Sequence, residues 1–83
     1  MDRDQLLEIV RAATVGVLGI DPATVTADSH FADDLEADSL ALVEIIMAVE
    51  DVLGIQVPED ELKEVRTVGS ALDLLQTKVG QPA

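Results

Sequence analysis

The interior of this chain has to be built almost entirely from aliphatic side chains, because Phe31 is its only aromatic residue and cysteine is absent. Sheet sandwiches tend to use aromatic-rich strands, whereas Leu, Ile, Val and Ala are sufficient to pack helices together. A length of 83 residues fits one small domain with a single core. We therefore expect an all-α fold in which residues 1–83 form one domain.

Hydrophobic periodicity predicts where the longer helices lie. Apolar residues recur at spacings of three and four over residues 3–17 and again over 68–79. A third segment, 39–53, has the same period but is more apolar, and Gly54 follows it as a helix terminator. The pattern predicts three helices of three or more turns.

Shorter signals complete the predicted secondary structure. Pro58 followed by three acidic residues is typical of a helix start, which predicts a short helix ending at Val65. Thr67 is suited to cap the last helix, and residues 80–83 are expected to fray. The whole chain is then a four-helix bundle with three longer helices and one short third helix.

A long loop is expected between the first and second helices. The stretch after Gly19 contains the turn dipeptide Asp21-Pro22 and shows no sustained period. Loops of more than about twelve residues are uncommon in compact domains and are often functional. We expect this loop to pack onto the bundle through Val25 and Phe31.

The segment 39–53 is apolar around most of its circumference. Six of its apolar residues cover one broad face, and Leu40, Val43 and Met47 extend this face sideways; only Glu44, Glu50 and Asp51 interrupt the pattern. Such a helix must be covered on more than one side, by core, by a bound apolar group or by a partner. The residues assigned to the broad face are Leu42, Ile45, Ile46, Val49, Val52 and Leu53.

The charge of the chain restricts its partners. Seventeen acidic residues stand against five basic ones, giving a formal net charge of −12. Nucleic acids and anionic membranes would repel such a chain, so basic proteins are the expected partners. The first residues lack a signal-peptide pattern, and no apolar stretch approaches the ~20 residues of a membrane span, so a cytoplasmic chain without membrane insertion is expected.

Ser39 is a lone hydroxyl where the acidic stretch gives way to the apolar helix. A serine nucleophile needs a base and a group that orients the base. The only histidine, His30, lies nine residues earlier in the predicted loop. No catalytic residues are therefore assigned, and the chain is not expected to be an enzyme.

The acidic residues around Ser39 do not form a recognisable metal loop. Counting from Asp34 as the first position of an EF-hand, Ser39 stands where glycine is needed and Ile45 where the bidentate glutamate is needed. No metal site is expected. The first turn of a helix does suit a phosphate esterified to Ser39, although an ordinary serine beside a cap formed by Asp38 explains the same residues.

Several motifs together resemble the acyl carrier protein family, in its free-standing form. They are Asp33-Asp34-Leu35, Asp38-Ser39-Leu40, Val43-Glu44, Leu53-Gly54-Ile55, Val57-Pro58-Glu59-Asp60 and Thr67-Val68-Gly69. The resemblance implies that a phosphopantetheinyl transferase attaches 4′-phosphopantetheine from coenzyme A to Ser39, with Asp38 and Leu40 beside it. The thiol absent from the chain would arrive on this group. Acyl thioesters would then pass, on a monomeric carrier, between ketosynthase, acyltransferase and other basic-patch enzymes of fatty acid or polyketide biosynthesis.

The same resemblance implies two surfaces. One would contact partner enzymes and comprises Leu40, Val43, Glu44, Met47, Glu50 and Asp51. The other would line a pocket for the acyl chain and comprises Phe31, Ile46, Val49, Leu62, Val65 and Ala71. Ordinary core packing is the alternative for the apolar members of both sets.

The chain departs from the family pattern in ways that leave other functions open. Glu36 stands where many members have glycine, and Ala41 and Leu42 replace residues that are often polar or acidic. These changes favour a specialised pathway over general fatty acid synthesis. A peptidyl or aminoacyl carrier, an unmodified acidic adaptor and a small hydrolase using Ser39 and His30 are the alternatives.

Overall fold

The computed structural model describes residues 2–79 and contains four α-helices and one short 3-10 turn. The elements are α1 (Arg3–Leu18), η1 (Pro22–Thr24), α2 (Ser39–Leu53), α3 (Glu59–Leu62) and α4 (Val68–Val79). Within the described residues no strand forms, and the all-α prediction with a short third helix is confirmed. The predicted fraying of residues 80–83 lies outside the described residues.

Local side-chain contacts explain where the long helices begin. At α1 the Asp2 carboxylate accepts a hydrogen bond from the Gln5 N–H, and the Gln5 side chain accepts one from the Asp2 N–H. At α4 the Thr67 hydroxyl accepts from the Ser70 N–H while the Ser70 hydroxyl accepts from the Thr67 N–H. These reciprocal pairs satisfy N–H groups that a helix start otherwise leaves unpaired.

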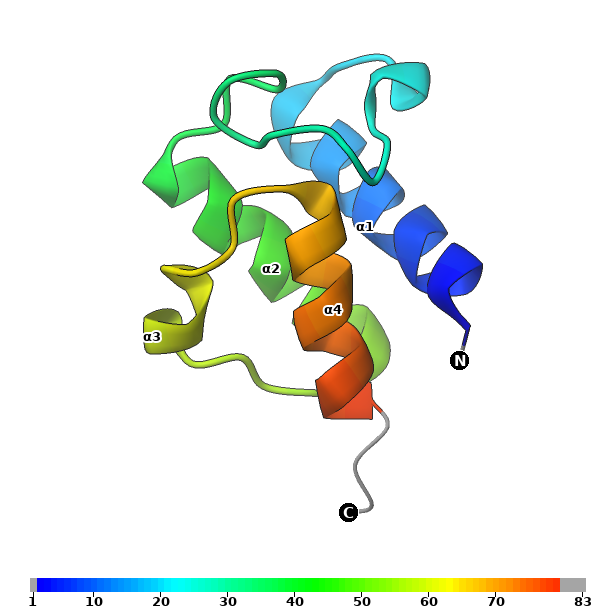
Figure 1. Cartoon of the computed structure of the whole chain (residues 1–83), viewed down its shortest axis with the longest axis vertical. Coiled ribbons are helices and arrows are strands. Elements are labelled where there is room, and N and C mark those ends of the chain that lie inside the picture. The colour runs from blue at the N-terminus through cyan, green and yellow to red at the C-terminus, as the bar shows by residue number, and fades with distance from the viewer. Residues whose placement is uncertain (1, 80–83) are drawn as a thin grey trace.

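Apart from Phe31, the hydrophobic core is aliphatic, and it lies where α1 packs against both α2 and α4. Figure 1 shows these three helices as the body of the molecule, with α3 at its edge and the long loop crossing one end. The fully buried side chains come from every long helix and from the loop. The largest of them are Leu6, Ile45, Ile46, Leu72, Leu75, Val10, Val25, Val49 and Val68.

The loop between α1 and α2 is attached to the rest of the molecule by backbone hydrogen bonds. Ser29 and Ala27 offer their carbonyls to the first N–H groups of α4, at Val68 and Gly69. The Arg11 guanidinium donates twice to the Val25 carbonyl. Val25 and Phe31 are buried, so both predicted anchors of the loop are confirmed.

The third helix is shorter than the sequence indicates. It ends at Leu62 rather than Val65, because the next N–H groups bond three residues back instead of four: Glu64 to Glu61 and Val65 to Leu62. The tighter turn leads into Arg66, whose carbonyl accepts a hydrogen bond of 3.0 Å from the Phe31 N–H. This bond joins the segment after α3 to the long loop.

Candidate functional site

Ser39 is the first residue of α2 and is exposed. The residue before it, Asp38, has extended backbone geometry, and its carboxylate accepts a 2.8 Å hydrogen bond from the Ala41 N–H. The predicted cap is therefore present. Asp38 provides the side-chain cap of α2, and this cap does not involve the Ser39 hydroxyl.

The three serines of the chain differ in what their hydroxyl groups do. Ser29 is buried and its hydroxyl donates to the Thr24 carbonyl at 2.8 Å. The Ser70 hydroxyl donates to the Thr67 carbonyl at 2.8 Å and accepts from two N–H groups. Within residues 2–79 the Ser39 hydroxyl makes no hydrogen bond. Only Ser39 therefore offers an exposed hydroxyl that the fold does not use.

Ser39 opens onto a cleft of about 620 Å³ between the long loop, the start of α2 and the segment after α3. The apolar part of its wall includes Phe31, Leu62 and Val65 from the expected acyl pocket, together with Ala37 and Leu42. The other three expected pocket residues, Ile46, Val49 and Ala71, are buried in the core and do not line this cleft. The structure thus brings half of the expected set together around Ser39.

The cleft also carries charged groups of both signs. Asp33 and Asp38 line it together with His30. Lys63 and Arg66, from the segment after α3, line it as well. Sequence reasoning missed these two cations. In the sequence the two residues are only three positions apart. That spacing does not indicate that they share a cleft with Ser39, which becomes apparent only from the turn at residues 63–66.

His30 is an exposed loop residue. Its backbone pairs with Thr67 in an isolated bridge, and its N–H donates to the Asp34 carboxylate at 2.7 Å. Although His30 and Ser39 line the same cleft, no hydrogen bond joins their side chains in the described part of the chain. The geometry does not form a serine–histidine pair.

The expected partner residues on α2 fall into two groups. Leu40 and Met47 are 68% and 56% exposed, Val43 is half-buried, and Glu44 and Asp51 are exposed. Glu50 is different, because its carboxylate accepts a 2.6 Å hydrogen bond from the Val57 N–H and so supports the chain after α2.

One residue of the broad apolar face of this helix is not buried in the core. Val52 belongs to that face with Ile45 and Val49, but it is 67% exposed. It lies instead beside Ile9 and Ala48 in a shallow apolar depression between α1 and α2. Val52 keeps the helical spacing from Val49, but the neighbouring residues of α1 leave most of its side chain exposed.

Two features are absent from residues 2–79. No group of three or more His, Asp or Glu side chains is placed to hold a metal ion. None of the helices in this range is long and apolar enough to cross a membrane.

Comparison with known proteins identifies what the chain resembles as a whole. A family model described as a phosphopantetheine attachment site matches residues 8–75. A curated acyl carrier protein of Rubrobacter xylanophilus is 42% identical over 73 residues, which cover 88% of this chain and 90% of the relative. Those of Thermosynechococcus vestitus and Petrotoga mobilis are 40% and 42% identical over 79 residues, 95% of this chain and 98% and 93% of the respective relative.

Proposed function

This chain belongs to the acyl carrier protein family, and we propose that Ser39 is the residue to which its 4′-phosphopantetheine is attached. It is a carrier with a phosphopantetheine attachment site and not a catalyst. One observation carries the assignment to Ser39: among the three serines, it alone has an exposed hydroxyl free of structural hydrogen bonds.

The position of Ser39 suits a transfer in which the chain supplies only the nucleophilic oxygen. The Oγ–phosphorus bond forms as the pyrophosphate bond of coenzyme A breaks, and adenosine 3′,5′-bisphosphate leaves. The hydroxyl proton goes to a base of the transferase, since His30 makes no hydrogen bond to Ser39. The start of α2 then places backbone N–H dipoles near the new phosphodiester.

The cleft next to Ser39 fits a phosphopantetheine arm and an attached apolar chain. Its wall combines apolar side chains from Phe31, Leu62 and Val65 with polar and charged groups near the serine. When bound, the arm supplies the thiol that holds the cargo as a thioester. The chain itself orients the arm at α2 and shields part of it against this wall.

The exposed part of α2 is the proposed docking surface for partner enzymes. Leu40 and Met47 give it apolar contact area, while Glu44 and Asp51 give it negative charge. A surface of this kind attracts basic patches and speeds encounter with them. The proposed partners are the phosphopantetheinyl transferase, a ketosynthase, an acyltransferase and related enzymes.

The curated relatives bear the name acyl carrier protein, which favours acyl over aminoacyl cargo. We propose that residues 1–83 act as one cytoplasmic, monomeric carrier domain in fatty acid or polyketide biosynthesis. The substitutions Ala41 and Leu42 beside the serine support a specialised pathway. Leu42 contributes to this argument because it lines the cleft.

Loading with coenzyme A and a broad-specificity phosphopantetheinyl transferase tests the assignment. Intact-mass spectrometry should show a gain of one phosphopantetheine in the wild type and none in Ser39→Ala. Ser70→Ala is the matched control and should still be loaded. Loading of Ser39→Ala, or failure to load the folded wild type, would contradict the assignment.

A further inference from the structure

The five cationic side chains of this acidic chain differ in their contacts. Three bond to other elements of the fold. Arg3 bonds Asp73 and Gln76 across α1 and α4, Arg11 bonds the Val25 carbonyl, and Lys78 pairs with Glu61. The remaining two, Lys63 and Arg66, are exposed and lie on the wall of the cleft that contains Ser39.

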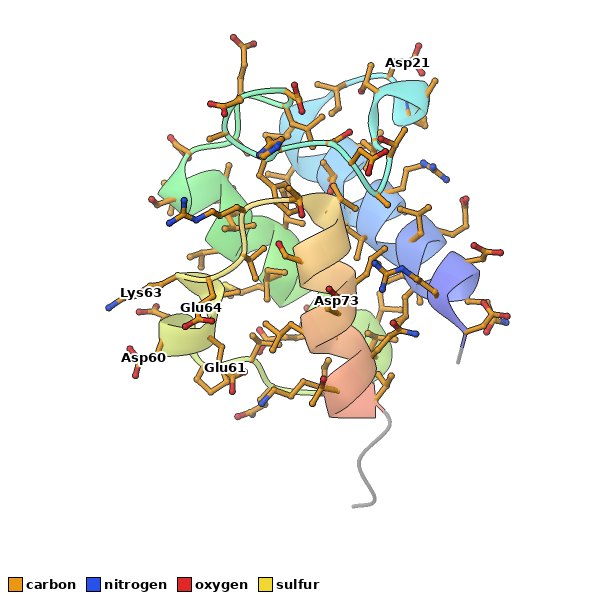
Figure 2. The ribbon with its side chains drawn as sticks, viewed as in Figure 1. Asp21, Asp60, Glu61, Lys63, Glu64 and Asp73 are labelled. Atoms are coloured by element: carbon orange, nitrogen blue, oxygen red, sulfur yellow. The ribbon has the colours of Figure 1, made fainter. Side chains whose placement is uncertain are left out.

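Neither of these two residues is neutralised by a close ion pair. Lys63 approaches Asp60 only at 3.9 Å, with both side chains at least 80% exposed, and Figure 2 shows it extending from the edge of the molecule beyond α3. No carboxylate in residues 2–79 lies within 4 Å of the Arg66 guanidinium. Such cations are available to a further anion.

The backbone of Arg66 is held in place although its side chain is free. Its N–H donates to the Ser70 hydroxyl and its carbonyl accepts from the Phe31 N–H, both at 3.0 Å. The guanidinium therefore starts from a fixed point between α4 and the long loop. Only the rotamers of the Arg66 side chain then have to be ordered when the guanidinium meets a ligand, because the backbone is already fixed.

Negative charge surrounds Ser39 and would repel an anion attached there. Asp33 and Asp38 line the same cleft, and the chain carries a net charge of −12. A phosphodiester adds another negative charge beside these carboxylates. Cations in the same cleft lower this repulsion, and the two that line it are Lys63 and Arg66.

We propose that Arg66 and Lys63 form a binding site for the phosphodiester of the arm, drawing the base of the arm into the cleft. The inference rests on attachment at Ser39. It assigns a role to two residues that neither the helix pattern nor the acidic docking surface explains. Arg66 is the main partner, because its backbone is fixed, and Lys63 adds a second charge.

A thermodynamic cycle tests this pair. The thermal midpoints of the apo and loaded forms are compared in the wild type, in Lys63→Gln/Arg66→Gln and in Gln56→Glu. The Gln56→Glu control lowers the net charge outside the cleft, at an exposed loop residue. Taking the loaded-minus-apo difference within each protein cancels the effect of each variant on the fold itself.

At low salt, we expect the loaded-minus-apo difference in thermal midpoint to be about 2–4 °C higher in the wild type than in the double variant. The Gln56→Glu control should match the wild type, and 0.5 M salt should remove the difference because it screens exposed charges. Loading should also move the Nε–Hε resonance of Arg66 in the wild type.

Equal midpoint changes in the wild type and the double variant would overturn the inference. If the double variant were then loaded more slowly, the two cations would be assigned to contact with the transferase instead. A folded wild type that gains no mass would overturn the attachment at Ser39 and the inference with it. A wild type that gains the mass but shows equal changes overturns the inference alone.

Discussion

The side-chain carboxylate of Glu50 accepts a hydrogen bond of 2.6 Å from the backbone N–H of Val57, seven residues further along the chain. The bond closes the turn that follows α2 and brings the buried Val57 back to the core. Glu50 therefore has a structural role, which distinguishes it from the exposed acids Glu44 and Asp51 on the same helix.

Replacing Glu50 by alanine should lower the free energy of unfolding by about 1–2 kcal/mol, because the N–H of a buried residue loses its acceptor. Glu50→Gln keeps an acceptor and should lose less. Asp51→Ala, an exposed change on the same helix, should stay within about 0.5 kcal/mol of the wild type. Urea unfolding followed by circular dichroism measures all three. Equal stability of Glu50→Ala and Asp51→Ala would contradict the role of this bond.

Replacing Glu36 by glycine should make the protein more stable. Its backbone φ is 55°, the left-handed region that a side chain disfavours, and no other non-glycine residue in the described range has a positive φ. Glu36→Gly should raise the free energy of unfolding by about 0.5–1 kcal/mol, the relief of strain less the extra freedom of unfolded glycine. Glu36→Gln removes the charge and keeps the strain. If both variants gain equally in urea titrations, the charge and not the backbone is responsible.

The Asp38 cap should contribute about 1 kcal/mol to stability, since its carboxylate satisfies the Ala41 N–H at the start of α2. Asp38→Ala loses this contribution, whereas Asp38→Asn retains an oxygen acceptor and should remain close to the wild type. Thermal unfolding monitored by circular dichroism compares them. A midpoint for Asp38→Ala equal to that of Asp38→Asn would show that the helix start does not depend on the cap.

Changes in the proposed docking surface on α2 should affect loading of the carrier without affecting its fold. Leu40→Ala and Glu44→Lys alter exposed side chains, so each should stay within about 0.5 kcal/mol in stability. Glu44→Lys should lower kcat/KM for loading by roughly tenfold at low salt, because it opposes attraction to a basic enzyme surface. Asp28→Lys makes the same charge change on the long loop and should have little effect. A fall of equal size in both variants would indicate a response to net charge alone.

Self-repulsion predicts that salt stabilises this protein. With a net charge of −12, screening should relieve repulsion among the exposed carboxylates. Raising NaCl from 10 mM to 0.5 M should add about 1 kcal/mol, roughly 4–8 °C in the thermal midpoint. Millimolar magnesium should have a similar effect through loose association. A midpoint that stays flat across both titrations would contradict the prediction.

The long helices could be predicted from the sequence, because the features that determine them lie within each helix or next to it. The 3.6-residue period and the caps at Asp38 and Thr67 define α2 and α4 within a few residues of chain. Val25 and Phe31 were also identifiable, since an apolar residue in a long polar loop has few other uses.

The cleft and its cations were not predictable in the same way. It forms only when the Phe31 N–H meets the Arg66 carbonyl, a contact between segments far apart in sequence. Until then Lys63 and Arg66 are ordinary basic residues. The exposure of Val52 and the bond from Val57 to Glu50 also depend on tertiary structure: the first depends on which parts of α2 the other helices cover, and the second on the path of the turn after α2.

The junction between the long loop and α4 tolerates some substitutions far better than others. Main-chain atoms make it, through the carbonyls of Ala27 and Ser29, so the exposed side chains of the loop can change without removing these bonds. Gly69 is the exception, because a Cβ there would come within 2.9 Å of the Ala27 carbonyl oxygen. Random mutagenesis should therefore recover varied side chains at the exposed positions around this junction but only glycine at position 69, where even a methyl group would require the loop or the helix to shift.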